Sequence, residues 1–210
     1  MQIYRTPFSR AYWADALADF RKLRTLVFSA LMIAACVALS YVPSIPVTDG
    51  VKVTWGFLAR ALCAMVGGPV NALVFGFAED TISFFINPGG AYFPGYTLTT
   101  MLGTLIYALF LYRTRVTVLR VFLAKLSTNI LNVFLGSLWS AILLGKGYLY
   151  RMTTSAMKNV FMLPVQTVML VFLFAALIPV LYRMGLMPRQ AGNHLRLRWG
   201  KQPAPDVSAT

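Results

Sequence analysis

Long hydrophobic runs separated by short polar segments dominate the chain. Three of them, at 25–42, 101–112 and 159–182, contain no charged residue. A membrane-spanning helix needs about 20 mainly apolar residues. We therefore expect an all-α integral membrane protein, a six-transmembrane-helix bundle formed by residues 22–185. The six predicted spans are 24–43, 52–67, 69–87, 95–112, 118–144 and 157–183.

The two ends of the chain differ in character from the spans. Residues 186–210 combine basic residues with Gly, Pro, Ser and Gln, which indicates a flexible basic cytoplasmic tail. Residues 1–21 form a cytoplasmic segment with an amphipathic pattern, which predicts a helix lying in the membrane interface or docked on a cytoplasmic partner. Its apolar face would carry Tyr12, Trp13, Ala16, Leu17 and Phe20, with Asp15 and Asp19 opposite.

Composition supports the membrane assignment. The 210 residues are 58% hydrophobic and 12% charged, with a mean hydropathy of +0.67, and a soluble domain of this length could not keep so much apolar surface from water. The one histidine, His194, falls in the tail, and Cys36 and Cys63 fall inside spans. The sequence therefore offers neither a histidine triad nor a zinc cluster, and we expect no enzyme of the ordinary hydrolytic kind.

The distribution of charge predicts the orientation. The net charge is +13, and with six spans most of the cations fall on the side of both termini. By the positive-inside rule, this side is the cytoplasm. No nucleic-acid recognition motif accompanies the basic residues, so we expect no nucleic-acid partner. The predicted cytoplasmic cations are Arg5, Arg10, Arg21, Lys22, Arg24, Arg113, Arg115, Arg120, Arg183, Arg189, Arg196, Arg198 and Lys201, against Lys52, Lys146 and Arg151 outside.

Adjacent carboxylates, Glu79 and Asp80, fall inside the third predicted span, and Arg60 falls inside the second. An ionised group in hydrocarbon costs at least about 2.5–3.5 kcal/mol, so such groups normally face a partner, a cavity or a ligand. Arg60 can neutralise one carboxylate in an internal pair that only fixes helix packing. The other carboxylate would still need water or a ligand.

Polar residues also line one stripe of the fifth predicted span. A stripe of this composition facing lipid would be costly, so we expect it to face the bundle interior. It could form interhelical hydrogen bonds, or it could bind a flat heterocycle through amide groups and an indole ring. The stripe consists of Lys125, Asn129, Asn132, Gly136 and Trp139, spaced by four, three, four and three residues.

Arg151 and Lys158 flank the start of the sixth predicted span on the poorly charged outer side. Seven residues apart, they would share a helical face and could hold carboxylates. The alternative is that both cations reach toward the membrane interface. In the first span, Ala30, Ala34 and Ala38 recur every four residues, a spacing that lets another helix approach closely, either within the bundle or from a partner.

Two outer loops stand out, at 43–52 and 87–95. The second, NPGGAYFPG, combines two prolines and three glycines with Tyr92 and Phe93. A segment of this composition near a cavity mouth is typical of a lid. The residues expected to gate such a cavity are Pro46, Asp49, Pro88, Gly89, Gly90, Tyr92 and Pro94.

Taken together, these segments resemble the substrate-binding S component of an energy-coupling factor (ECF) vitamin transporter, over about residues 22–185. The alanine stripe and GGPVNALVFGFAED (67–80) carry the family resemblance. Three further stretches are similar to the folate branch of that family. They are NPGGAYFPGYTLTTMLGTLIYALFLY (87–112), the stretch 132–139, and MKNVFMLPVQ (157–166).

The resemblance implies a high-affinity receptor in a bacterial plasma membrane that captures folate or a related pterin outside. It would deliver the ligand inward as part of an ECF-type ABC importer, together with a transmembrane coupling protein and two ATPase subunits. The chain itself would need no cofactor, because the partners would hydrolyse ATP; no Gly-rich phosphate loop is present. The two loops would gate the pocket, and Ala30, Ala34 and Ala38 would face the coupling protein.

The resemblance also implies roles for particular residues. The pterin ring would lie near Asn132, Trp139 and Tyr96, with Phe93 and Asp80 in the same binding site. The glutamate carboxylates of folate would meet Arg151 and Lys158.

Alternatives to the folate reading remain open at the level of the sequence. The Glu79–Asp80 pair carries more charge than the lone Asp expected for the family, and Lys125 lies deep in its span, so the ligand could be a different vitamin. An integral-membrane enzyme acting on a lipid-linked phosphate could use Glu79 and Asp80 as magnesium ligands. A passive channel or structural bundle would explain the spans but not the aromatic loop.

Overall fold

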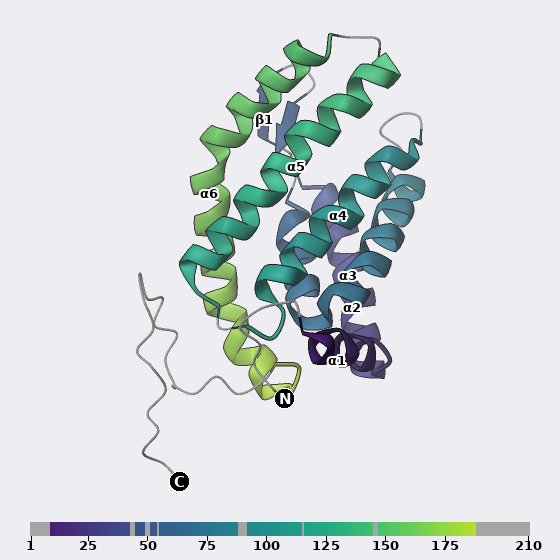
Figure 1. The fold of residues 1–210 in the computed structure, drawn as a ribbon, viewed down its shortest axis with the longest axis vertical. Coiled ribbons are helices and arrows are strands. Elements are labelled where there is room, and N and C mark those ends of the chain that lie inside the picture. Colours follow the sequence, from purple (N-terminus) through teal and green to yellow (C-terminus); the bar gives the residue numbers. More distant parts are fainter. Residues whose placement is uncertain are drawn as a thin grey trace.

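The computed structural model describes residues 9–42, 45–48, 51–53, 55–87, 92–114, 116–144 and 147–187. Within these ranges, six helices pack side by side or across one another, with a small β-hairpin at one end (Figure 1). The elements are α1 (Arg10–Phe20), α2 (Leu23–Ser40), β1 (Ile45–Thr48), β2 (Val51–Val53), α3 (Phe57–Ile86), α4 (Pro94–Leu111), α5 (Val118–Leu144) and α6 (Tyr148–Arg183).

Five helices, α2 to α6, are long and apolar enough to cross a membrane. The chain is therefore a multi-pass membrane protein, and its spanning part is all-helical, as predicted. The antiparallel hairpin, in which Ile45 pairs with Val53, is an addition that the sequence reading did not expect. It lies at the end of the bundle where α5 ends and α6 begins, which we call the hairpin end (Figure 1). The opposite end, where α1 lies, is the α1 end.

Helix α3 is the core of the bundle and folds back on itself. In a straight helix, nineteen residues span about 28 Å, yet Arg60 forms an ion pair with Glu79 at 2.9 Å. The reversal occurs at Gly68, whose φ of 77° is in the region that favours glycine, and Pro69 follows it. The helix thus has a first arm (57–67) and a second arm (69–86). In the most apolar stretch of α3, 72% is buried inside the bundle, so α3 is the central element.

The two arms correspond to the predicted spans at 52–67 and 69–87. The predicted start at residue 52 is wrong, because 51–53 form strand β2 and the first arm begins at Phe57. The predicted start of the last span at 157 is also wrong, since α6 begins at Tyr148. Polar residues are accommodated in its first turns, where their hydroxyls bond backbone carbonyls one turn back, as Thr153 does to Leu149 and Thr154 to Tyr150.

Replacing Gly68 by alanine is expected to destabilise the fold by about 2–3 kcal/mol. The added methyl would meet the Tyr112 ring at 2.9 Å in a backbone conformation that side chains rarely adopt. Gly103→Ala is the matched control, because a methyl there meets nothing within 4 Å. Thermal unfolding of the purified variants in detergent measures the difference. Equal unfolding temperatures for the two variants would show that the fold-back does not depend on Gly68.

Helix α1 is fixed to the α1 end of the bundle. Tyr12 and Ala16 are buried, and the Tyr12 hydroxyl donates to the carbonyl of Ala108. Asp19 is buried too and accepts hydrogen bonds from Tyr112 at 2.7 Å and from Arg113 at 2.8 Å. The expectation that Asp19 lies on the face opposite the apolar residues is therefore wrong. The aspartate belongs to the docking face because Tyr112 and Arg113, just after the end of α4, bind it.

Lowering the pH is expected to weaken the docking of α1. Burial raises the pKa of Asp19, but hydrogen bonds from Lys22, Tyr112 and Arg113 outweigh it and leave the pKa below its ordinary value. The stabilisation is therefore complete above the ordinary pKa of about 4 and is lost as the pH falls through the lower, folded-state value. Proteolysis of the α1 segment between pH 5 and 3 measures it. Asp19→Asn should make cleavage less pH-dependent; an unchanged profile would contradict the assignment.

The end of α6 revises the boundary of the tail. Gly185 has a φ of 69° and ends the helix, and the Leu186 N–H bonds back to the carbonyl of Leu181 at 3.0 Å. Met187 is buried in the main core cluster. The predicted flexible tail therefore cannot begin at 186, and residues 188–210 lie outside the described part of the chain.

Candidate functional site

Three aromatic side chains meet at the hairpin end between α4 and α5. The Phe93 ring lies 6.1 Å from that of Tyr96 and 5.5 Å from that of Trp139, centroid to centroid. The Trp139 indole donates to Thr99 Oγ1 at 3.0 Å, and the Tyr96 hydroxyl bonds Ser140 at 3.1 Å. Gly95 permits this packing, because a Cβ there would lie 2.3 Å from the Phe93 ring. The structure thus brings together three of the residues predicted to bind a flat ring.

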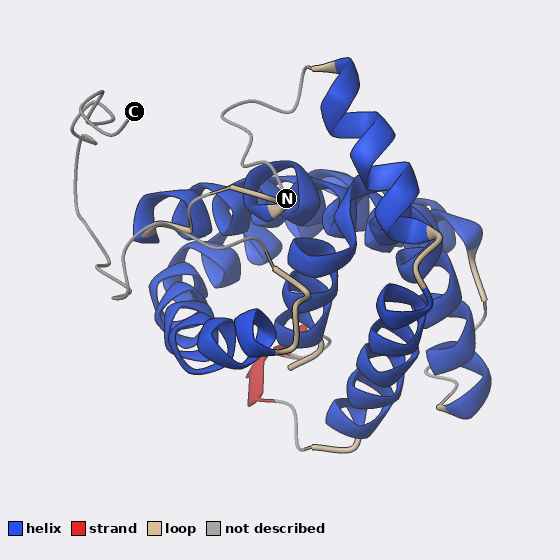
Figure 2. Ribbon diagram, turned by 90° about the horizontal axis from the view of Figure 1, so that it is seen from below, coloured by secondary structure: helices blue, strands red, loops and turns tan. Residues whose placement is uncertain are grey.

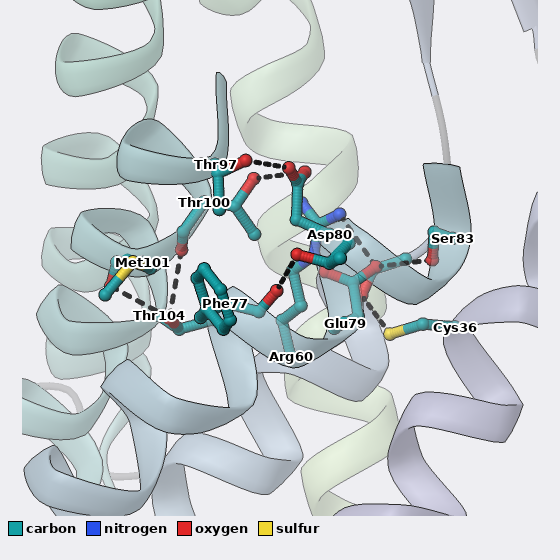
Figure 3. Close-up of polar contacts among 12 residues, drawn as sticks. Cys36, Arg60, Phe77, Glu79, Asp80, Ser83, Thr97, Thr100, Met101 and Thr104 are labelled. Carbon is teal, nitrogen blue, oxygen red and sulfur yellow. Dashed lines mark hydrogen bonds and ion pairs between the residues drawn. The ribbon is translucent and has the colours of Figure 1, made fainter. Parts of the chain in front are cut away.

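The adjacent carboxylates have different partners (Figure 3). Asp80 accepts hydrogen bonds from Thr97 at 2.7 Å and from Thr100 at 3.1 Å, both on α4. The sequence analysis did not single out these threonines, although their i, i+3 spacing places them on one helical face. Because Asp80 uses neutral hydroxyl donors, its charge is not cancelled by these contacts.

Glu79 faces the first arm of α3 instead. Arg60 donates two hydrogen bonds to it, at 2.9 and 3.1 Å, and Ser83 adds a third at 3.3 Å. Figure 3 also places the Cys36 thiol within hydrogen-bonding reach of the same carboxylate. The Glu79 side chain is only 3% exposed. The pairing with Arg60 therefore explains Glu79 as a packing element that holds the two arms together.

A cavity of about 230 Å³ opens beside the aromatic cluster. It contains Asp80 together with Tyr92, Phe93 and Tyr96, so four predicted binding or gating residues share one cavity. Ser40, Ser83, Phe84 and Asn87 complete its lining.

A larger groove of about 510 Å³ follows α6 near the hairpin end. Its lining comes from α6 and consists of Leu149, Tyr150, Thr153, Thr154, Met157, Lys158 and Phe161. Lys158 is half-buried, so this predicted cation does face a space large enough for part of a ligand.

Two further cations lie on α5 and α6. The buried Lys125 of α5 has its ammonium 4.4 Å from the centre of the Phe57 ring. Arg151 is half-buried, and its Nε has no hydrogen-bond partner among the described residues. A buried donor without a partner is costly, so this position favours an acceptor from a ligand.

The polar stripe of α5 is only partly internal. Lys125 and Asn129 are buried, and Trp139 is half-buried, but Asn132 is exposed. The expectation that the whole stripe faces the interior is therefore wrong at Asn132. The buried amide is Asn129, whose Nδ2 lacks a partner among the described residues, as does Oε1 of the buried Gln166 on α6. Gln166 was not predicted; its polarity within an apolar run is the signal that could have marked it.

The predicted gating residues are only partly described. Tyr92 is exposed and its hydroxyl bonds Thr97 at 3.1 Å, while Pro94 is the first residue of α4. Pro46 belongs to strand β1. Asp49, Pro88, Gly89 and Gly90 lie outside the described residues. Their gating role stays a prediction.

The alanine stripe lies on the surface. Ala30, Ala34 and Ala38 are all exposed on α2, next to exposed Leu26, Val27 and Leu31. Packing inside the bundle therefore does not account for the stripe, and the surface is open to lipid or to another protein.

Comparison with known proteins decides the family. Residues 20–188 match the family described as the S component of the ECF-type riboflavin transporter. The chain belongs to this family of ECF S components. The resemblance predicted from the sequence is thereby confirmed, and it covers the bundle from the end of α1 to the end of the described residues.

Two relatives of this S component concern a different vitamin. The folate transporter FolT of Clostridium novyi (strain NT) is 32% identical over 151 residues, which cover 71% of this chain and 87% of the relative. A crystal structure of FolT bound with folic acid aligns with a TM-score of 0.65 at 27% identity, covering 72% of this chain and 91% of that one. The Clostridium novyi relative is described as a transporter.

Proposed function

We propose that the chain is the folate-binding subunit of an ECF-type ABC importer, which captures folate or a related pterin outside the cell. The observation that carries the proposal is the distribution of charge around the candidate site. Arg60 is paired with Glu79. Lys158 lines the α6 groove and Arg151 lies one to two turns before it on the same helix, whereas Asp80 lines the separate cavity beside the aromatic cluster. A ligand with two carboxylates would suit the two α6 cations.

This distribution favours folate over riboflavin, the vitamin in the description of the matching family. The glutamate of folate carries two carboxylates, whereas riboflavin carries none. A neutral ligand would remove water from these cations without offering them a charge, whereas carboxylates form charge-assisted hydrogen bonds with Arg and Lys. The sequence relation to FolT supports the same choice.

Within this proposal the two ends of folate occupy different parts of the site. The pterin ring would stack against Phe93, Tyr96 and Trp139, next to Asp80, with Asn132 as the amide partner that the resemblance implies. The glutamate carboxylates would reach Arg151 and Lys158 along the α6 groove. Asp80 suits the pterin end, because a carboxylate can accept hydrogen bonds from ring N–H and amino groups.

The gates proposed for this site are the loop segments at the hairpin end. Tyr92 and Pro94, with the undescribed Pro88, Gly89 and Gly90, would form one gate. Pro46 and Asp49 would form the other.

The proposed topology has six passes, with residues 22–185 as the membrane domain. The two arms of α3 run in opposite directions from Gly68, which packs against Tyr112 at the α1 end. Counting each arm as a pass adds one to the five long helices. Both termini would then lie on the side of α1, and the many cations of that side support a cytoplasmic location in a bacterial cell under the positive-inside rule.

Transport would require partners. A transmembrane coupling protein would pack against Ala30, Ala34 and Ala38, which are exposed and small enough for close helix contact. Two ATPase subunits would hydrolyse ATP, so this chain would need no cofactor of its own.

Calorimetric titration of the ligand-free protein in detergent tests the proposal. We expect one folate to bind per chain without ATP or metal, and riboflavin to bind at least about 100-fold more weakly, the equivalent of 2.7 kcal/mol. Tight riboflavin binding without folate binding would keep the family and overturn the ligand. If neither binds, the proposed receptor function is wrong.

A further inference from the structure

Helix α1 precedes nearly all of the range that matches the family, which begins at residue 20. Figures 1 and 2 show α1 lying across the α1 end of the bundle rather than along the helix axes. A helix that is perpendicular to the spans and held at their end runs parallel to the membrane surface. The orientation of α1 therefore needs an explanation of its own, separate from the transport function.

The three faces of α1 differ in chemistry. Tyr12, Ala16 and Asp19 face the bundle and are buried. A second face carries Trp13 and Leu17, which are 43% and 45% exposed although both are large and apolar. The remaining face carries small residues, as at Ala14 and Ala18, and is exposed.

Positive charge surrounds the second face. Arg10 at the start of α1 and Arg21, Lys22 and Arg24 just after its end are exposed. The acids of α1 offset these charges only in part, because Asp15 and Asp19 are both bound by Arg113, which follows the end of α4. Asp19 also pairs with Lys22 at 2.6 Å, while Arg10, Arg21 and Arg24 add further exposed charge. The surroundings of Trp13 and Leu17 are therefore strongly cationic.

We infer that this face of α1 is a binding surface for anionic phospholipid head groups. Tryptophan favours the membrane–water interface, and a cation close to an anionic membrane surface adds about 1 kcal/mol of attraction. The lipid is the occupant that the fold itself brings near, since α2 continues from α1 with exposed Leu23, Leu26 and Val27. A protein partner would have to displace this lipid.

The ion pair between Arg113 and Asp19 makes α1 different from a loosely tethered amphipathic helix. It fixes α1 relative to the spans, so lipid binding to α1 also fixes the depth of the bundle in the membrane. The depth of single positions on α1 therefore reports the inferred surface.

Spin labels on the full chain in nanodiscs test the inference. Leu17→Cys probes the proposed lipid face, and Ala14→Cys is the matched control on the small-residue face. Cys36 and Cys63 are buried, which directs labelling to the new cysteine. In nanodiscs containing phosphatidylglycerol, we expect the ratio of oxygen to nickel-chelate accessibility to be at least about threefold higher at 17 than at 14. Equal ratios would overturn the inference.

The charge dependence supplies a second test. Replacing phosphatidylglycerol by phosphatidylcholine, or introducing Arg10→Gln and Arg21→Gln, should reduce the difference between the two positions by half or more. A difference that persists unchanged in both cases would overturn the role of anionic lipid. Shielding of position 17 that occurs only when a coupling protein is added would assign the face to that partner instead. Folate binding, which does not involve α1, shows that each variant is folded.

Discussion

Replacing Glu79 by alanine is expected to destabilise the protein by about 3–5 kcal/mol, enough to prevent recovery of folded protein from the membrane. Removing the carboxylate leaves the Arg60 guanidinium without its bidentate partner inside the bundle. The neighbouring Asp80 offsets the remaining charge only in part, because Thr97 and Thr100 hold its carboxylate toward α4. Since the pair joins the two arms of α3, its loss also removes one of the contacts that hold the fold-back closed.

Two further variants separate charge from packing in this prediction. Replacing both partners, as Arg60→Met with Glu79→Leu, removes the unpaired charge and should restore most of the stability. Asp80→Asn is the matched control, since it keeps oxygen and nitrogen atoms next to the same threonines and leaves Arg60 paired. Size-exclusion profiles after heating measure all of them. A double variant no more stable than Glu79→Ala would show that the loss comes from packing and not from the buried charge.

The lengths of the hydrophobic runs predict most of the helices. They do not predict where polar residues extend a helix or where a strand replaces one. The span at 118–144 agrees with α5, and the predicted 95–112 differs from α4 by one residue at each end. The predictions fail where a polar run remains helical, as at the start of α6, and where a short alternating segment forms a strand, as at 51–53. In both cases backbone hydrogen bonds decide the structure. The hydropathy of the local sequence does not report these bonds.

The candidate site shows a similar division. Spacing along one helix correctly predicted that Trp139 faces inward, but it could not show that Asn132 is exposed while Asn129 is buried, because the bundle covers only part of the stripe. The pairing of Glu79 with Arg60 was one of two readings, and the fold-back at Gly68 decides between them. The partners of Asp80 could not be predicted, since they depend on how α3 and α4 are aligned.

Replacing Arg151 and Lys158 by alanine is expected to weaken folate binding by about 10- to 100-fold for each residue. A hydrogen bond to a charged group contributes about 1.5–3 kcal/mol, and 1.4 kcal/mol corresponds to a factor of ten. The two side chains lie seven residues apart on α6, and Lys158 lines the groove of about 510 Å³. The expected loss appears as a faster dissociation rate, because removing a buried contact in a formed complex mainly affects how long the ligand stays.

The loss of affinity should depend on whether the ligand carries carboxylates, and not on the stability of the protein. A neutral pterin fragment lacks the carboxylates, so its affinity should be the same for wild-type and variant protein. Arg183→Ala removes a cation of the same helix at the α1 end and should leave folate binding unchanged. If both ligands lose affinity equally, the cations support the fold of the site, and the carboxylates bind elsewhere. If folate affinity does not change, the excess of positive charge near α6 has a different partner, and the argument for folate over riboflavin fails with it.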